Sequence, residues 1–172
     1  MSDIVIVSAA RTPVGSFNGS FTDMSAADLG SIAIKEAINR AKVKTSEVSE
    51  VIMGQVLTAS CGQNPARQAS INAGIPNEIT AYTINQVCGS GLRSIALGWQ
   101  SIMNDESEII VAGGQENMTQ APHCFHLRQT GKIGDAEMID SMIKDGIWDI
   151  FNGYHMGVTA ENVAEKWQIT RD

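Results

Sequence analysis

The stretch Asn85-Gln86-Val87-Cys88-Gly89-Ser90-Gly91-Leu92-Arg93-Ser94 lies between a β-type run, Ala81-Tyr82-Thr83-Ile84, and an apolar run that continues to Met103. This order predicts a strand, a tight turn and a helix, with Cys88 at the start of the helix. The positive end of a helix dipole favours a nucleophilic thiolate. Gly89 and Gly91 permit the turn and leave room for a substrate. The alternative is a buried, unreactive cysteine, which is the usual state of a free thiol.

The rest of the chain repeats this alternation of strand and helix. Apolar runs predict buried strands over 4–7, 51–56 and 109–112, in addition to the β-type run 81–84. Ser25 with Asp28 resembles a capping box, and Asn64-Pro65 resembles an N-cap followed by the first helical residue. These signals predict helices from Ser25 to Ala41 and from Pro65 to about Gly74. We therefore expect an α/β domain with a parallel-rich sheet and helices on both faces.

The helix predicted over 92–103 is apolar on nearly every side. Its apolar residues are Leu92, Ile95, Ala96, Leu97, Trp99, Ile102 and Met103. A helix of this kind has to be buried all round. If the chain stood alone, part of this helix would form an exposed apolar patch. We therefore expect it to be covered by a partner, either a further part of the same protein or another subunit.

Composition excludes several classes of function. The 172 residues carry 12 basic and 19 acidic side chains, a formal net charge of −7, and no basic stripe, which argues against nucleic acid as a partner. The three cysteines are odd in number and form no Cys-x-x-Cys pair, which is typical of reduced intracellular thiols. No apolar run approaches the roughly 18 residues of a membrane helix, so we expect no membrane and a cytoplasmic location.

The segment His123-Cys124-Phe125-His126 is the one place where a metal site could be considered. Its potential ligands are crowded together, and no fourth ligand lies near them in the sequence. We therefore expect no bound metal.

Five separate segments resemble segments of the thiolase family, and within it the acetyl-CoA acetyltransferases. The resemblance runs along nearly the whole chain, with the segments in the family's order. They are Ser8-Ala9-Ala10-Arg11-Thr12-Pro13-Val14-Gly15, Gly62-Gln63-Asn64-Pro65-Ala66-Arg67-Gln68-Ala69, the stretch 85–94, Ala121-Pro122-His123-Cys124, and Gly153-Tyr154-His155-Met156-Gly157.

The resemblance implies a thiolase-like layered sandwich domain over residues 1–117. It implies that 118–158 starts a loop domain, which contacts coenzyme A and carries an excursion that joins dimers into tetramers. Residues 159–172 would begin a helical continuation, with a helix from Thr159 to about Trp167. The chain stops on helix-start residues, Thr170 and Asp172, which indicates truncation, cleavage or a split subunit.

The resemblance also implies an activity, the Claisen condensation of two acetyl-CoA to acetoacetyl-CoA or the reverse thiolysis. Cys88 would carry the acyl group, and its backbone N–H would donate to one oxyanion. His155 and Met156 match positions that line the pantetheine and acyl part of the pocket, and Ile147 matches another coenzyme A contact. From sequence alone, His155 also fits a hydrogen-bonded loop residue, and Ile147 fits the core of a loop. No permanently bound cofactor is implied, because coenzyme A thioesters are the substrates, and the implied assembly is a homotetramer.

Two features depart from the family pattern. These residues contain no Gly-His-Pro, Cys-x-Gly-Gly-Gly or Asn-Glu-Ala-Phe segment, which in thiolases supply the other catalytic groups, so we expect no activity from this chain alone. Gln115 and Asn117 replace residues of the usual Met-Glu-Ser-Met segment, which leaves substrate preference open. The alternatives are a related ketosynthase-type enzyme, or a chain that binds coenzyme A or a thiolase subunit without turnover.

Overall fold

The computed structural model of the chain describes residues 3–126, 128 and 135–172. They form two compact units, Met1–Gln120 and Ala121–Asp172. Positions 127 and 129–134, which belong to the predicted loop-domain segment 118–158, lie outside the described residues.

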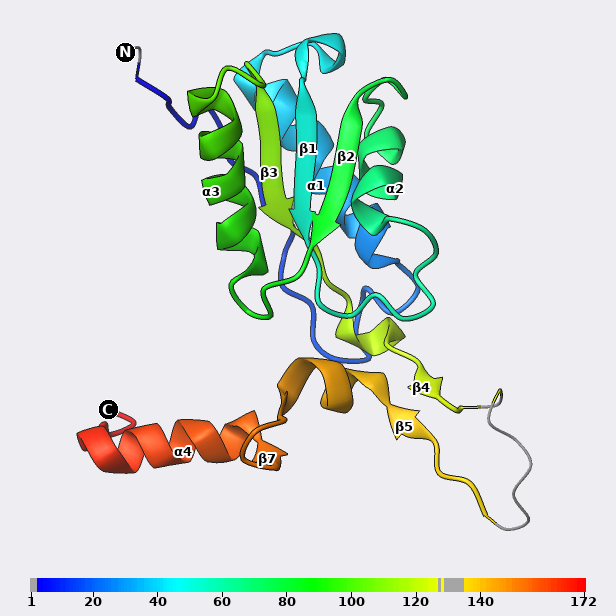
Figure 1. Ribbon diagram of the computed structural model, residues 1–172, viewed down its shortest axis with the longest axis vertical. Coiled ribbons are helices and arrows are strands. Elements are labelled where there is room, and N and C mark those ends of the chain that lie inside the picture. Colours follow the sequence, from blue (N-terminus) through cyan, green and yellow to red (C-terminus); the bar gives the residue numbers. More distant parts are fainter. Residues whose placement is uncertain (1–2, 127, 129–134) are drawn as a thin grey trace. The chain divides into compact units, whose positions relative to one another are not determined.

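The first unit is built on a three-stranded parallel sheet. Its strands are β1 (Glu50–Gly54), β2 (Thr80–Ile84) and β3 (Ile110–Gly114), in the order β2-β1-β3. The three arrows run in one direction, with β1 in the middle (Figure 1). Gly54 is in register with Ile84 on one side and Gly114 on the other. The carboxyl ends of all three strands therefore meet at one edge of the sheet.

Helices cover both faces of this sheet, as the alternation in the sequence predicts. They are α1 (Ala26–Ala41), α2 (Pro65–Asn72) and α3 (Ser90–Met103), with short 3-10 turns at η1 (Thr45–Glu47) and η2 (Met118–Gln120). Alternate residues of β1 point to opposite faces. Val51 and Met53 pack toward α1 and α2, whereas Gly54 lies against the start of α3.

The helix starts follow the signals in the sequence. The predicted capping box is present, because the Ser25 hydroxyl accepts from Asp28 N at 3.0 Å and Ser25 N donates to Asp28 Oδ2 at 3.1 Å. Asn64 caps α2 by accepting from Arg67 N at 3.2 Å, and Pro65 is its first residue. α3 begins at Ser90, two residues before the predicted start at Leu92.

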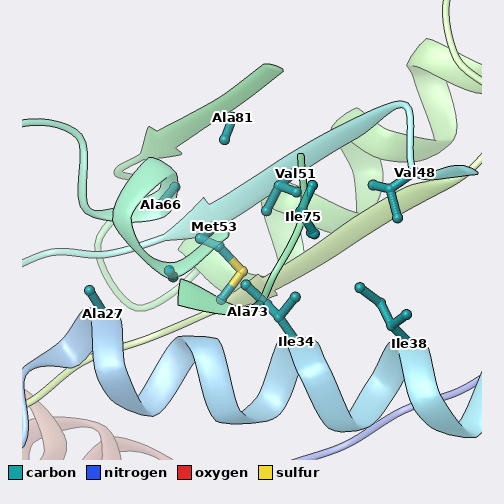
Figure 2. Close-up of a cluster of buried hydrophobic side chains, with 11 residues drawn as sticks. Ala27, Ile34, Ile38, Val48, Val51, Met53, Ala66, Ala73, Ile75 and Ala81 are labelled. Carbon is teal, nitrogen blue, oxygen red and sulfur yellow. The ribbon is translucent and has the colours of Figure 1, made fainter. Parts of the chain in front are cut away.

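The core of the unit lies between β1, α1 and α2. Alanines on α2 allow that helix to approach closely, and larger branched side chains on α1 and β1 fill the space between them (Figure 2). Its buried members include Ile34, Ile38, Val48, Val51, Met53, Ala66, Ala69, Ala73 and Ile75.

The expectation of a buried strand over 4–7 is wrong for this structure. The segment has no strand conformation, and Val5, Ile6 and Val7 are 68%, 75% and 68% exposed. A strand needs a hydrogen-bonded neighbour, and no described strand pairs with this segment. Instead, the residues that follow it are attached to α1. Ser8 Oγ donates to Ala37 O at 2.6 Å, and Arg40 Nη1 donates to Ala9 O at 3.0 Å.

α3 is buried on one side only, not all round. The residues that it buries, Ser90, Ser94 and Gly98, are small. Leu92 and Trp99 are 76% and 51% exposed, and Ile95 and Met103 are also exposed. The exposed apolar patch expected for this chain is therefore present.

The second unit contains short elements and one longer helix. β4 (His123–Cys124) pairs antiparallel with β5 (Ile139–Asp140), and β6 (Trp148–Asp149) with β7 (Tyr154–His155). A π-helical turn, η4 (Met142–Ile147), precedes β6, and α4 (Met156–Trp167) follows β7. Among the described helices, none combines the length and apolarity needed to cross a bilayer.

α4 ends at Trp167 as predicted but begins three residues before the predicted start at Thr159. The cause is His155, whose Nδ1 accepts from Gly157 N at 2.9 Å and caps the helix. Histidine is not among the residues usually found at this position. The sequence therefore offered no cue to the true start.

Gly54 allows α3 to dock directly on the end of β1. A methyl group at Gly54 would lie 2.5 Å from the carbonyl carbon of Ser90 and 2.7 Å from Gly91 N. We predict that Gly54→Ala lowers the free energy of unfolding by about 1–3 kcal/mol, as overpacking does. Urea unfolding of the purified chain measures this loss. Gly113→Ala is the matched control, because its methyl would make ordinary contacts, 3.6 Å from Met53 Sδ. An equal loss in both variants contradicts the prediction.

Candidate active site

Cys88 lies in the turn that joins β2 to α3, at the carboxyl edge of the sheet. The turn begins after Ile84, and Gly89 is the cap residue of α3. Cys88 is exposed, whereas Cys61 and Cys124 are both partly buried. The alternative of a buried Cys88 is therefore wrong, and the residue lies in the predicted strand-to-helix turn.

Hydrogen bonds within the turn fix its shape. Ser90 Oγ accepts from Gln86 N at 2.8 Å and donates to Val87 O at 2.6 Å. The N–H of Val87 donates to Asn85 Oδ1 at 2.8 Å. The backbone on the N-terminal side of Cys88 is therefore held by two nearby side chains.

The segments that leave β1, β2 and β3 are joined to one another at this edge. The Glu116 carboxylate accepts from Val56 N at 2.8 Å and from Leu57 N at 3.1 Å. Asn85 Nδ2 donates to Val56 O at 3.4 Å. Burial raises the pKa of Glu116, and the two backbone bonds lower it by less. The loop after β1 thus lies between Glu116 and the Cys88 turn.

Gln115 and Asn117, the two departures from the family pattern, make internal hydrogen bonds. The buried Gln115 Nε2 donates to Gln55 Oε1 at 2.9 Å. Asn117 Nδ2 donates to Phe21 O at 2.8 Å and to Met24 O at 2.7 Å. A serine would have to share its one hydroxyl proton between Phe21 O and Met24 O, whereas the Asn117 amide has a proton for each. These side chains therefore have a structural role in the first unit.

In the second unit the structure brings Ile147, His155 and Met156 together. Trp148 is in register with His155, so the residues next to them, Ile147 and Met156, lie at the same end of the β6–β7 pair. His155 is exposed, and the other two side chains are half-buried. His155 is also hydrogen-bonded locally as the cap of α4, which is the simpler of its two sequence interpretations. Cys88 belongs to the first unit, so these three residues form a set of their own.

The remaining cysteine and histidine candidates have ordinary surroundings. Cys61 Sγ accepts from Gln55 Nε2 at 3.5 Å, and burial raises the pKa of this thiol. His123 Nε2 lies 3.8 Å from Asp140 Oδ2 across the β4–β5 pair. Within the part of the chain that the structure describes, no three side chains with His, Cys, Asp or Glu ligand atoms gather as a metal site would require.

Known proteins resemble this chain over its whole length. The family model of the thiolase N-terminal domain matches residues 4–172. Similar relatives include the acetyl-CoA acetyltransferases of Rhizobium meliloti (62% identical over 98% of this chain and 43% of the relative) and Paracoccus denitrificans (59%, over 99% and 44%). The cytosolic acetyl-CoA acetyltransferase of Rattus norvegicus is 54% identical over 98% of the chain and 43% of its own length. The chain thus spans less than half the length of these relatives.

The raised pKa of Glu116 predicts a pH-dependent stability. Because burial raises this pKa above its value in the unfolded chain, the folded chain binds the proton more tightly. The resulting stabilisation is complete at low pH and is lost as the pH rises through the folded-state pKa. We predict that the free energy of unfolding of the unmodified chain, relative to Glu116→Gln, falls as the pH rises above about 4, the ordinary range of a glutamate pKa.

Urea unfolding at a series of pH values measures this difference. Glu47→Gln is the control, because Glu47 is exposed and its carboxylate accepts a backbone bond from Lys44 N at 2.7 Å. A difference between the unmodified chain and Glu116→Gln that stays constant with pH contradicts the assignment.

Proposed function

Because the chain belongs to the thiolase family, as its N-terminal domain, we propose that it provides the nucleophile of an acetyl-CoA C-acetyltransferase. The observation that carries this proposal is the exposed Cys88 in a rigid turn at the start of α3. The names of the relatives, acetyl-CoA acetyltransferases, support the substrate. They also favour this reaction over that of a ketosynthase-type enzyme.

In the proposed reaction the Cys88 thiolate attacks the carbonyl carbon of acetyl-CoA. The bond between that carbon and the coenzyme A sulfur breaks, coenzyme A leaves, and the acetyl group remains on Cys88. A second acetyl-CoA then loses an α-proton, and its α-carbon attacks the acetyl carbonyl. A carbon–carbon bond forms, the bond to Cys88 breaks, and acetoacetyl-CoA is released. The backbone N–H of Cys88, at the start of α3, would donate to the oxyanion that forms in this reaction.

The proposed acid and base for these proton transfers lie outside these 172 residues. The resemblance assigns them to a histidine and a second cysteine in the C-terminal part of a thiolase. The exposed apolar side of α3, with Leu92 and Trp99, gives that part, or another subunit, a surface to cover. We propose that the assembled enzyme is a cytoplasmic homotetramer, a dimer of dimers. In it, 118–158 would form the start of the loop domain.

Ile147, His155 and Met156 are the proposed contacts to the pantetheine and acyl groups of coenzyme A thioesters. Their proximity at one end of the β6–β7 pair supports a shared role. Ile147 and Met156 offer apolar surface, and His155 offers a ring nitrogen for a hydrogen bond. Coenzyme A is here a substrate and not a resident cofactor.

A second candidate function is binding without turnover. It is favoured by the absence of Gly-His-Pro and Cys-x-Gly-Gly-Gly segments from the sequence of these residues. In this case the isolated chain would bind a coenzyme A thioester or a thiolase subunit and leave it unchanged. Turnover of acetoacetyl-CoA by the purified chain, with no other polypeptide present, would exclude this candidate.

The nucleophile is tested in a fused enzyme, in which this chain is joined to the C-terminal part of the Rhizobium meliloti relative. We predict that Cys88→Ala lowers kcat for thiolysis of acetoacetyl-CoA by at least about 10⁴-fold, as loss of a nucleophile does. It also removes the acetyl group that mass spectrometry detects on the protein after incubation with acetyl-CoA. Cys124→Ala is the control and keeps both. Acetyl labelling that persists in Cys88→Ala contradicts the proposal.

The binding role of His155 has to be separated from its role as the cap of α4. We predict that His155→Ala and His155→Asn both raise KM for acetoacetyl-CoA in the fused enzyme. The fold-change is expected to be about 5–10, the loss of roughly one hydrogen bond to the ligand. Asparagine keeps a capping acceptor and so preserves the helix. A KM that is normal in His155→Asn and raised only in His155→Ala assigns His155 to capping alone.

A further inference from the structure

Val87, the residue before Cys88, has an unfavourable backbone conformation. Its φ is +48°, in the left-handed region that favours glycine. For a β-branched residue this conformation is rare and strained. Its side chain is 41% exposed, so packing around the side chain does not explain the conformation. Other groups must hold Val87 in place.

Both backbone polar groups of Val87 are bonded to neighbouring side chains, and its carbonyl oxygen also accepts from Ser90 N at 3.1 Å. Its N–H donates to Asn85 Oδ1 at 2.8 Å, and its carbonyl oxygen accepts from Ser90 Oγ at 2.6 Å. The same Ser90 oxygen accepts from Gln86 N at 2.8 Å. The Ser90 hydroxyl therefore spans the turn across Cys88, because its partners precede Cys88 and Ser90 follows it.

Ser90 is itself fixed on the sheet. It is 4% exposed and lies against Gly54, where no side chain could be accommodated. One turn further along α3, the buried Ser94 Oγ donates to Gly91 O at 2.6 Å and to Gly113 O at 2.9 Å. The start of α3 is thus attached to the ends of both β1 and β3. Because Ser90 is fixed in this way, its hydroxyl can hold the exposed Val87 in an unfavourable conformation.

We propose that Ser90, assisted by Asn85, is a positioning residue for Cys88, and that it acts by holding Val87 in the left-handed conformation. This inference rests on the proposed function, in which Cys88 is the nucleophile. Ser90 touches neither substrate nor reacting atom. It keeps the Cys88 thiol beside the first turn of α3, where the proposed acyl transfer takes place. Without it, Val87 relaxes to an ordinary conformation and the thiol moves away from the helix end.

The test is a double-mutant cycle between positions 90 and 87. The rate at which iodoacetamide alkylates Cys88 in the purified chain is measured at pH 7 by peptide mass spectrometry, with Cys124 as the internal reference. Ser90→Ala is expected to slow alkylation about tenfold, the factor that one hydrogen bond or one strained dihedral typically represents. Val87→Gly removes the backbone strain at this position, because glycine adopts a positive φ without steric cost. Adding it to Ser90→Ala is therefore expected to restore the rate to within about threefold of the unmodified chain.

A merely structural role for Ser90 would not give this rescue. The proposal is overturned if Ser90→Ala slows alkylation of Cys88 by the same factor in the unmodified chain and in Val87→Gly. It is also overturned if Ser90→Ala does not slow alkylation at all. Should Ser90→Ala fail to fold by circular dichroism, Asn85→Ala provides the same test. Asn85 is exposed, and its loss removes the other bond to Val87 without emptying the core. Slowing by Asn85→Ala that Val87→Gly does not reverse also overturns the proposal.

A second readout separates this inference from the proposed function. In the fused enzyme, Ser90→Ala is expected to lower kcat about tenfold and to leave KM for acetoacetyl-CoA unchanged, because the residue positions the nucleophile and does not bind substrate. If the alkylation cycle shows the rescue but acetyl-CoA does not acetylate Cys88 in the fused enzyme, the positioning role stands and the proposed function fails. If acetylation occurs and the cycle shows no coupling, the proposed function stands and the positioning role fails.

Discussion

The direct contact between the start of α3 and the ends of β1 and β3 is the constraint on which the candidate site depends. At this contact backbone meets backbone, because Gly54, Gly91 and Gly114 carry no side chains to separate the elements. The close approach lets Ser94 reach a carbonyl of β3 and buries Ser90 beside β1. A helix held in this way has a fixed N-terminal end, and a thiol placed there keeps a fixed relation to the sheet.

This contact requires polar groups to be buried at the carboxyl edge, and the chain satisfies most of them internally. Gln55 pairs with Gln115, and Glu116 accepts the two N–H groups that follow. An unpaired polar group in this position would cost free energy, so these pairs favour the observed arrangement of the segments after β1 and β3. Gln115 and Asn117, which depart from the family pattern, therefore stabilise the first unit through their internal hydrogen bonds. Both residues lie outside the segment 85–94 that contains Cys88.

Much of the first unit could be predicted from the sequence, because its signals are local. The capping box at Ser25, the Asn64-Pro65 start and the strand-to-helix turn at Cys88 are each contained in a few residues. The segment 4–7 was mispredicted because its apolar pattern describes a strand but cannot supply a hydrogen-bonded neighbour. The cap at His155 and the left-handed Val87 depend on side-chain orientation, which spacing does not reveal. For the same reason the hydroxyl of Ser90, an ordinary small residue in the sequence, carried no visible signal.

The Cys88 turn and the set of Ile147, His155 and Met156 differ in the number of hydrogen bonds that hold them in place. The bonds around Val87 join residues between Asn85 and Ser90, and Asn85 also donates to Val56 O, so the turn is held by groups of the first unit. The set of Ile147, His155 and Met156 depends on two-residue strands, which contribute few ladder bonds of their own. A nucleophile has to be positioned to within a fraction of an ångström, whereas apolar contacts to a flexible pantetheine arm tolerate adjustment. The turn around the proposed nucleophile is therefore the more closely hydrogen-bonded of the two sets, as its proposed chemistry requires.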